Sequence, residues 1–184
     1  AIDVSLVGSE MCIRDRLKLY DNVKVDDKNN TIFCDSLFYD IEQEQIELLG
    51  SVTIKNENQL ITADKGLINN IDGKIKLLKN GKILSQNQIV RGDLIEIFSN
   101  KNKIESLKVY ENGIIISENT GYEKDKNNQN QLIINQDILK AEVIELKINE
   151  NEMSEIELIG MASSFIHLYE DSLYQGTNEI SGDK

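Results

Sequence analysis

Few side chains in this sequence have the types and spacing that catalysis or metal binding requires. His167 is the only histidine, and Cys12 and Cys34 are the only cysteines. None of them has a partner at the spacing of a zinc site or of a nucleophile with its base. Neither of the common glycine-rich phosphate loops occurs. We therefore expect a protein that is not an enzyme and that carries no cofactor and no metal.

Two of these residues fit simpler structural roles. His167 lies in the alternating run 164–169, where we expect an exposed position on a strand. Cys34 aligns with Ala63 and Gly92 in a repeat of 29 residues. We therefore expect it to be a small core residue rather than a nucleophile.

Four acids recur at equivalent positions: Asp35, Asp64, Asp93 and Glu142. On one face of a sheet they could form a carboxylate ladder that holds Ca²⁺. Calcium repeats normally add glycine and aspartate at close spacing, whereas each unit here offers one acid. Solvated charges that deter edge aggregation are the favoured interpretation.

The acids mark the repeat, since 64 − 35 = 29 and 93 − 64 = 29. Units beginning at Leu19, Leu48 and Leu77 align without a gap, a fourth begins near Leu107 and carries a polar insertion at 119–131, and a fifth begins at Leu158. In every unit a small residue directly precedes the acid; the pairs are Cys34 with Asp35, Ala63 with Asp64, Gly92 with Asp93, Ala141 with Glu142, and Gly182 with Asp183. The pattern predicts a repeat-built domain.

Each unit holds two stretches rich in β-branched residues, separated by polar clusters, which indicates strand, turn, strand. The fold class expected is all-β, an open antiparallel sheet of about five repeats of ~29 residues. Residues 138–148 could be a helix, but their alignment with 89–98 favours a strand. Asn80 with Gly81 and Asn112 with Gly113 lie inside apolar stretches, where they predict bulges that bend the long strands.

Alternation along a strand predicts which side chains face inward, because adjacent residues point to opposite faces. Small side chains at one level leave room for larger neighbours or for an apolar guest. If the sheet is open, the inward face would form an apolar groove suited to acyl chains. The candidate groove residues are Ile32, Phe38, Ile61, Ala63, Leu67, Val90, Gly92 and Leu94.

Residues 5–16, SLVGSEMCIRDR, match the translation of a transposase sequencing adaptor over ten consecutive codons. We therefore interpret residues 1–16 as not native and place a single domain at 17–184. Without them the chain has 32 − 3 = 29 acidic and 20 − 2 = 18 basic residues, a net charge of −11 instead of −12. Both ends would then be artificial, with any signal peptide lost upstream and the last strand cut at Lys184.

Charge and hydropathy argue against nucleic-acid binding and against a membrane-spanning helix. The basic residues are scattered in a chain of pI near 4.6, so nucleic acid is not expected as a ligand. The uninterrupted apolar runs are far shorter than the ~20 residues that cross a bilayer as a helix, so no transmembrane segment is expected.

The strings LLGSVTI and ITADKGLIN resemble the repeat unit of the OstA-like family, in which G-x-V-x-I, a turn and I-x-A-D-x-G/A recur. This family includes the lipopolysaccharide-transport proteins LptA and LptC and the N-terminal domain of LptD. The closing stretch from Gly160 is similar to OstA-like proteins of Bacteroidetes, and the resemblance covers residues 17–184.

The resemblance implies a β-taco or open jellyroll in the periplasm or cell envelope, associated with outer-membrane biogenesis. Its interior would shield the acyl chains of lipopolysaccharide or a related lipid. Its edge strands would join other OstA-like or Lpt proteins.

Two departures put the continuity of such a groove in question. The insertion at 119–131 interrupts the array, and Glu96 stands where Phe38 and Leu67 stand in their units. A structural β-solenoid or adhesin-like module without a lipid ligand, and a calcium-dependent surface module, remain the alternatives.

Overall fold

The fold is all-β, as predicted. A computed structural model describes residues 10–13, 16–26, 30–100, 103–149 and 152–182, and these contain no helix that could span a membrane. One sheet of twelve strands includes β1 (Glu10–Ile13), β2 (Arg16–Asp26), β3 (Thr31–Asp40), β4 (Gln45–Lys55), β5 (Leu60–Asn69), β6 (Lys74–Leu84), β7 (Gln88–Asn100), β8 (Lys103–Lys124), β9 (Asn130–Asn149), β10 (Glu152–Ile159), β11 (Ala162–Glu170) and β12 (Leu173–Gly182).

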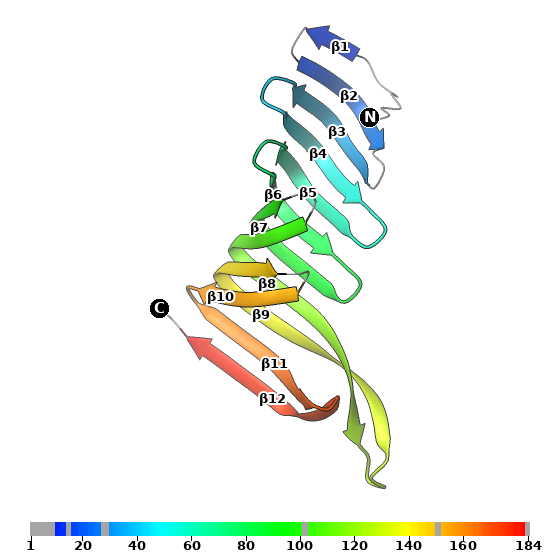
Figure 1. Ribbon diagram of the computed structural model, residues 1–184, viewed down its shortest axis with the longest axis vertical. Coiled ribbons are helices and arrows are strands. Elements are labelled where there is room, and N and C mark those ends of the chain that lie inside the picture. The colour runs from blue at the N-terminus through cyan, green and yellow to red at the C-terminus, as the bar shows by residue number, and fades with distance from the viewer. Residues whose placement is uncertain (1–9, 14–15, 27–29, 101–102, 150–151, 183–184) are drawn as a thin grey trace.

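Consecutive strands from β1 to β9 pair antiparallel with their neighbours, so the sheet grows along the long axis in sequence order (Figure 1). β10 and β11 pair with opposite halves of β9. β1 and the first residue of β2 lie within residues 1–16.

A bend recurs in every second strand. Two consecutive residues have positive φ in β2, β4, β6 and β8, and again between β10 and β11; the pairs are Asp21 with Asn22, Gly50 with Ser51, Lys79 with Asn80, Glu111 with Asn112, and Gly160 with Met161. Each of the four pairs within a strand stands opposite the single repeated acid of the next strand, as a bulge does. The predicted bends at Asn80 and Asn112 are thereby confirmed, although the left-handed positions are 79–80 and 111–112 rather than the glycines that follow.

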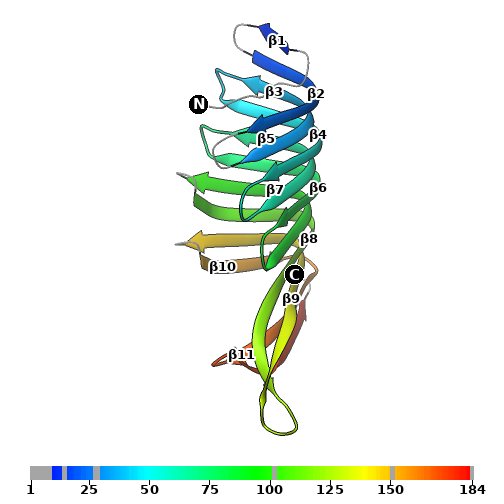
Figure 2. The same cartoon turned by 90° about the vertical axis from the view of Figure 1, so that its right-hand side faces the viewer.

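The bends fold the sheet into two facing layers, which Figure 2 shows joined along one side. We call the layers arm A (16–20, 36–49, 65–78, 94–110 and 143–159) and arm B (23–34, 52–63, 81–92, 113–116 and 139–141), within the described residues. The acid of each repeat lies at the bend between them.

Small residues of arm B make the tight bend possible. A Cβ added at Gly81 would lie 3.1 Å from Cδ1 of Ile95, and one added at Gly113 would lie 3.1 Å from Cγ1 of Ile144. Ile95 and Ile144 belong to the large, fully buried residues of arm A. The small residues at the bend thus make room for larger neighbours, and the interior beside the bend is packed.

The bend also shifts which residues face inward. In β5, Ala63 and Gly66 are both buried although they are three positions apart. In a strictly alternating strand, two residues on the same face are separated by an even number of positions. In β7, the buried pair across the bend is Gly92 and Ile95. Two successive residues, the acid and its follower, therefore point outward at each bend.

The polar insertion extends β8 and β9 into a long hairpin that passes beyond arm B. The β11–β12 hairpin packs against it, and Leu173 of β12 bridges back to Tyr122 of β8. We call residues 117–138 and 162–182 the C-terminal lobe, which lies at the lower end of Figure 1. In it, four strands pair in a closed ring.

Candidate functional site

A cleft opens between the free ends of the two arms. Its volume is about 170 Å³, and its walls come from five strands, β5 to β9, with Gln59 directly before β5 and Ser85 directly after β6. The lining residues are Gln59, Ile61, Ile83, Ser85, Gln88 and Val90 from arm B, and Ile97, Ile104, Leu107, Leu146 and Ile148 from arm A. Apolar side chains dominate, and the three polar ones carry no charge.

Strand register explains why these residues meet. Ile61 pairs with Ile83, which pairs with Val90, so one row of β-branched side chains crosses arm B. Ile97, Leu107 and Leu146 form the corresponding row across arm A. Because the arms face each other, the two rows form opposite walls.

The cleft is shallow, because the space nearer the bend is filled. Leu48, Leu77 and Ile95 are 0% exposed and belong to one continuous core. An apolar guest can therefore lie between the arm ends but cannot reach the bend without displacing core side chains.

The structure distributes the predicted groove residues over four places. Ile61 and Val90 line the cleft, and Ile32 packs partly buried against the core. Ala63 and Gly92 are buried beside the bend.

The other three candidates, Phe38, Leu67 and Leu94, are on the outer face of arm A, so their prediction as inward residues is wrong. They follow the acid by three, three and one positions, where the bend has reversed the alternation. Phe38 packs edge-on against Tyr20 at 5.7 Å. Leu67 lines an open hollow with charged neighbours such as Glu47.

Glu96 does not interrupt the cleft, because its position is on the same outer face. Its carboxylate lies 2.6 Å from the ammonium group of Lys76. The hydrogen bond from Lys76 lowers the pKa of Glu96, and the same pair raises the pKa of Lys76. The ion pair is a surface feature of arm A.

Sequence reasoning missed the arm A wall, although a signal was present. Two and four positions after the acid, the residues are Leu37 and Tyr39, Gly66 and Ile68, Ile95 and Ile97, Ile144 and Leu146. The residues of this second apolar series are separated from the small residue before the acid by an odd number of positions, so strict alternation would place them on the opposite face. Recognising the phase change would have moved the prediction from Leu67 and Leu94 to these residues.

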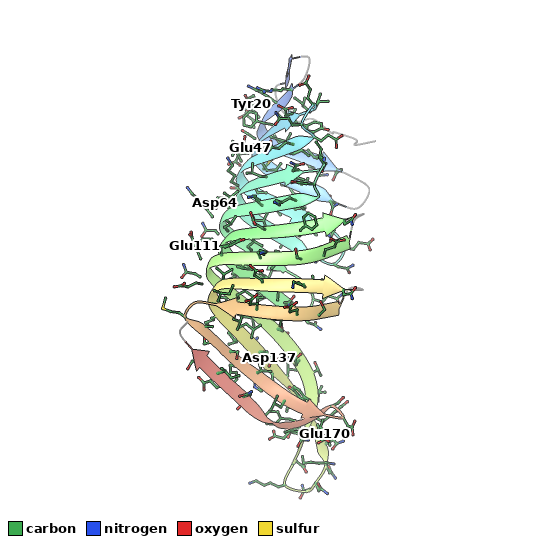
Figure 3. All side chains as sticks on the ribbon, turned by 60° about the vertical axis from the view of Figure 1, so that its left-hand side comes forward. Tyr20, Glu47, Asp64, Glu111, Asp137 and Glu170 are labelled. Atoms are coloured by element: carbon green, nitrogen blue, oxygen red, sulfur yellow. The ribbon has the colours of Figure 1, made fainter. Side chains whose placement is uncertain are left out.

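The repeated acids are exposed, as predicted, and they hold the bends together. Asn80 Nδ2 donates to Asp64 Oδ2 at 3.0 Å, and Asn112 Nδ2 donates to Asp93 Oδ2 at 3.2 Å. Asp64 and Glu111 lie on the same side of the stack in Figure 3. Among the described residues no three acids, histidines or cysteines gather as metal ligands.

Two of the bends contain a glycine, and in both the repeated acid of an earlier strand packs against that glycine. A Cβ at Gly50 would fall 2.0 Å from Asp35 Oδ2, and one at Gly160 would fall 2.2 Å from Glu142 Oε2. Both glycines have φ near +70°, a conformation that other residues adopt at a cost.

Cys34 is a buried core residue, as predicted. Burial raises the pKa of its thiol to about 11, with a further contribution from the charge of Asp35. The thiolate that nucleophilic chemistry requires is therefore disfavoured.

The prediction of an exposed His167 is wrong. Its side chain is 11% exposed, and its Nδ1 lies 2.9 Å from Asp137 Oδ1. Asp137, labelled in the lobe in Figure 3, also accepts from the His167 backbone N–H and from Asn119 Nδ2. This contact joins β11 to β9 across the insertion, and alternation within β11 alone does not reveal it.

No family model matches this chain, and no curated protein matches it.

Proposed function

We propose that the cleft between the arms holds an acyl chain of lipopolysaccharide or a related lipid. The chain would then be a non-enzymatic lipid-carrying module of the OstA-like type, working in the periplasm or cell envelope. The observation that supports this function is the cleft wall, which consists of eight apolar side chains and three uncharged polar ones. Such a wall offers burial to hydrocarbon without desolvating a charge.

The energetics are those of partition rather than reaction. Each buried CH₂ contributes ~0.8 kcal/mol, which offsets removal of the acyl chain from a membrane. The volume of 170 Å³ lies below the ~300–1,000 Å³ of pockets for drug-sized ligands, so one module covers only part of a lipid. The rest would extend along the open mouth or into a neighbouring module.

The sheet edge supplies a place for such a neighbour. β10 is the terminal strand of arm A in the strand order, whereas β12 pairs with β11 beside arm B. Addition of a strand from another OstA-like or Lpt protein to β10 would continue the arm A wall.

The charge of the chain is compatible with an anionic lipid under one condition. The net charge is −12, but no charged side chain lines the cleft. Phosphorylated head groups would therefore stay outside the arms, where they can meet divalent cations, while the acyl chain enters.

The test is crosslinking from a photoreactive residue placed at Ile61, in the cleft wall, with Leu67 on the outer face as the matched control. We expect an adduct with lipopolysaccharide at position 61 and none at position 67. Absence of an adduct at 61, under conditions where a known carrier labels, would overturn the lipid function.

The second candidate is a structural or adhesin-like module without a ligand. The packed interior favours it, because Leu48, Leu77 and Ile95 are fully buried without any guest. Under this alternative neither photoreactive position would label.

A further inference from the structure

The outer face of arm B carries a continuous apolar row. Ile61, Ile83 and Val90 face inward, so their strand neighbours face out. Register places the outward residues side by side across six strands; they are Leu60, Leu84, Ile89 and Ile116 in arm B, and Ile138 and Phe165 where the lobe adjoins it. Strands are spaced by about 4.8 Å, so the row is roughly 24 Å long.

Exposed hydrophobic residues continue this surface at its end in the lobe. Ile134 and Leu132 precede Ile138 at even spacing in β9, on the same face of the hairpin, and are 65% and 57% exposed. Such a contiguous surface is typical of an interaction site.

Cations border the row on the side toward the bend. Lys82 pairs with Arg91, Arg91 pairs with Ile114, and Ile114 pairs with Lys140, so three cations lie in one neighbouring row. In a chain of net charge −12 this is a local concentration of positive charge. The repeated acids also point outward, two positions nearer the bend, where Asp64 and Asp93 accept hydrogen bonds from Asn80 and Asn112. Farther from the bend, Asp26 lies 2.6 Å from Lys24, and Glu118 accepts from Gln136.

The outer face of arm A provides the contrast. Three of its lysines form ion pairs with neighbouring acids: Lys76 with Glu96 at 2.6 Å, Lys108 with Glu145 at 2.7 Å, and Lys65 with Glu47. Within the described residues, no such ion pair involves Lys82, Arg91 or Lys140. Charge thus distinguishes two faces that both contain apolar residues.

We propose that the outer face of arm B binds the surface of an anionic lipid bilayer. The apolar row would enter the boundary between head groups and acyl chains, and the three cations would meet the anionic head groups. The combination of a long apolar row with cations along one border matches an interfacial membrane contact better than the compact hot spots of a protein interface.

The orientation would bring the cleft close to the membrane. The apolar row occupies the same strand ends as the Ile61 and Val90 wall, on the opposite face of arm B. Docking would thus place the cleft mouth beside the bilayer surface. Contact between arm B and the bilayer does not require a lipid inside the cleft.

The first test is sedimentation with vesicles of phosphatidylglycerol and phosphatidylcholine, compared with phosphatidylcholine alone. We expect the unmodified chain to bind the anionic vesicles at low salt. The combined variant K82Q/R91Q/K140Q should partition on the order of 100-fold more weakly, at about fivefold per cation.

The matched control is K65Q/K76Q/K108Q, which changes the net charge by the same three units on arm A. It should keep anionic binding within a few-fold of the unmodified chain, and circular dichroism checks that both variants are folded. Equal losses in the two variants would mean that binding follows net charge alone, and would overturn the assignment to arm B. Absence of binding by the unmodified chain would also overturn it.

A second readout reports contact directly. The chain has no tryptophan. Phe165, at the lobe end of the apolar row, and Phe98 on arm A are 37% and 38% exposed. We expect the fluorescence of F165W to shift to the blue on anionic vesicles and that of F98W to stay unchanged. A shift at position 98 without one at position 165 would contradict the proposal.

Discussion

The repeat region and the C-terminal lobe use the same kind of strand but bury their side chains differently. From β2 to β9 a single apolar core runs through the bends, with Leu48, Leu77 and Ile144 at 0% exposure. In the lobe, only Gly121 and Ser164 are buried among the described residues. The lobe is held instead by polar contacts around Asp137 and by aromatic contacts of Tyr174 with His167 and Tyr169.

The difference follows from the bend. Where the small residue, the acid and the positive-φ pair recur, a strand folds across the sheet and its two halves bury each other. The insertion carries β8 and β9 straight on for several residue pairs without another bulge. With no second arm opposite, this segment relies on the β11–β12 hairpin for cover, and its apolar residues stay exposed. We expect the lobe to open at lower free energy than the repeat region.

The largest effect should come from truncating the repeat core. Leu48→Ala removes a fully buried side chain and should lower the free energy of unfolding by about 2–5 kcal/mol. Leu168→Ala in the lobe, where the side chain is 47% exposed, is the matched comparison and should cost less than ~0.5 kcal/mol. Urea unfolding measures both, and equal costs would contradict the difference between the regions.

The next effect should be confined to the lobe. Asp137→Ala leaves the His167 backbone N–H and Asn119 without their acceptor, at a cost of about 1–3 kcal/mol. Amide exchange should accelerate in β11 and β12 and stay unchanged in β4 to β6. A uniform acceleration throughout the chain would mean that the lobe and the repeats unfold as one unit.

A substitution at a bend should lower the free energy of unfolding by a smaller amount. Gly50→Ala places a Cβ against Asp35 and requires a left-handed alanine, at a cost of about 1–2 kcal/mol for the conformation alone. Adding Asp35→Ala should recover the part due to the clash, measured as a coupling energy in a double-mutant cycle. Strict additivity of the two variants would refute direct contact between the acid and the bend.

The smallest effect should come from the surface of arm A. Glu96→Gln breaks the ion pair with Lys76 and should cost about 0.5 kcal/mol at neutral pH. Because the pKa of Glu96 is lowered in the fold, its contribution is present above the ordinary glutamate pKa of 4.5 and is lost as the pH falls below it. Thermal melts of both proteins should therefore converge in acid and in high salt. A difference that persists there would need another cause.

Much of the fold could be predicted from sequence. The 29-residue spacing of Asp35, Asp64 and Asp93, the small residue before each, and the Asn80 and Asn112 bends indicated an all-β repeat, which the structure confirms. The site was predicted in part: Ile61 and Val90 line the cleft, whereas Phe38, Leu67 and Leu94 are outside. In β3, β5 and β7 the acid and the residue after it both point outward at the bend, which reverses the alternation beyond it. Strict alternation therefore placed three candidates on the wrong face.

By itself, the sequence determined what is local and repeated: strand propensity, turn positions, the repeat period and an inward strand face that carries no charged side chains. The tertiary structure alone decided which rows oppose each other, because residues such as Val90 and Ile148 meet through the folding of the sheet and not through spacing along the chain. It also decided that His167 meets Asp137, because that contact depends on where an inserted hairpin ends and which strand covers it. Local sequence patterns determine which face of a strand a side chain is on, whereas the bend determines which other side chains that face contacts.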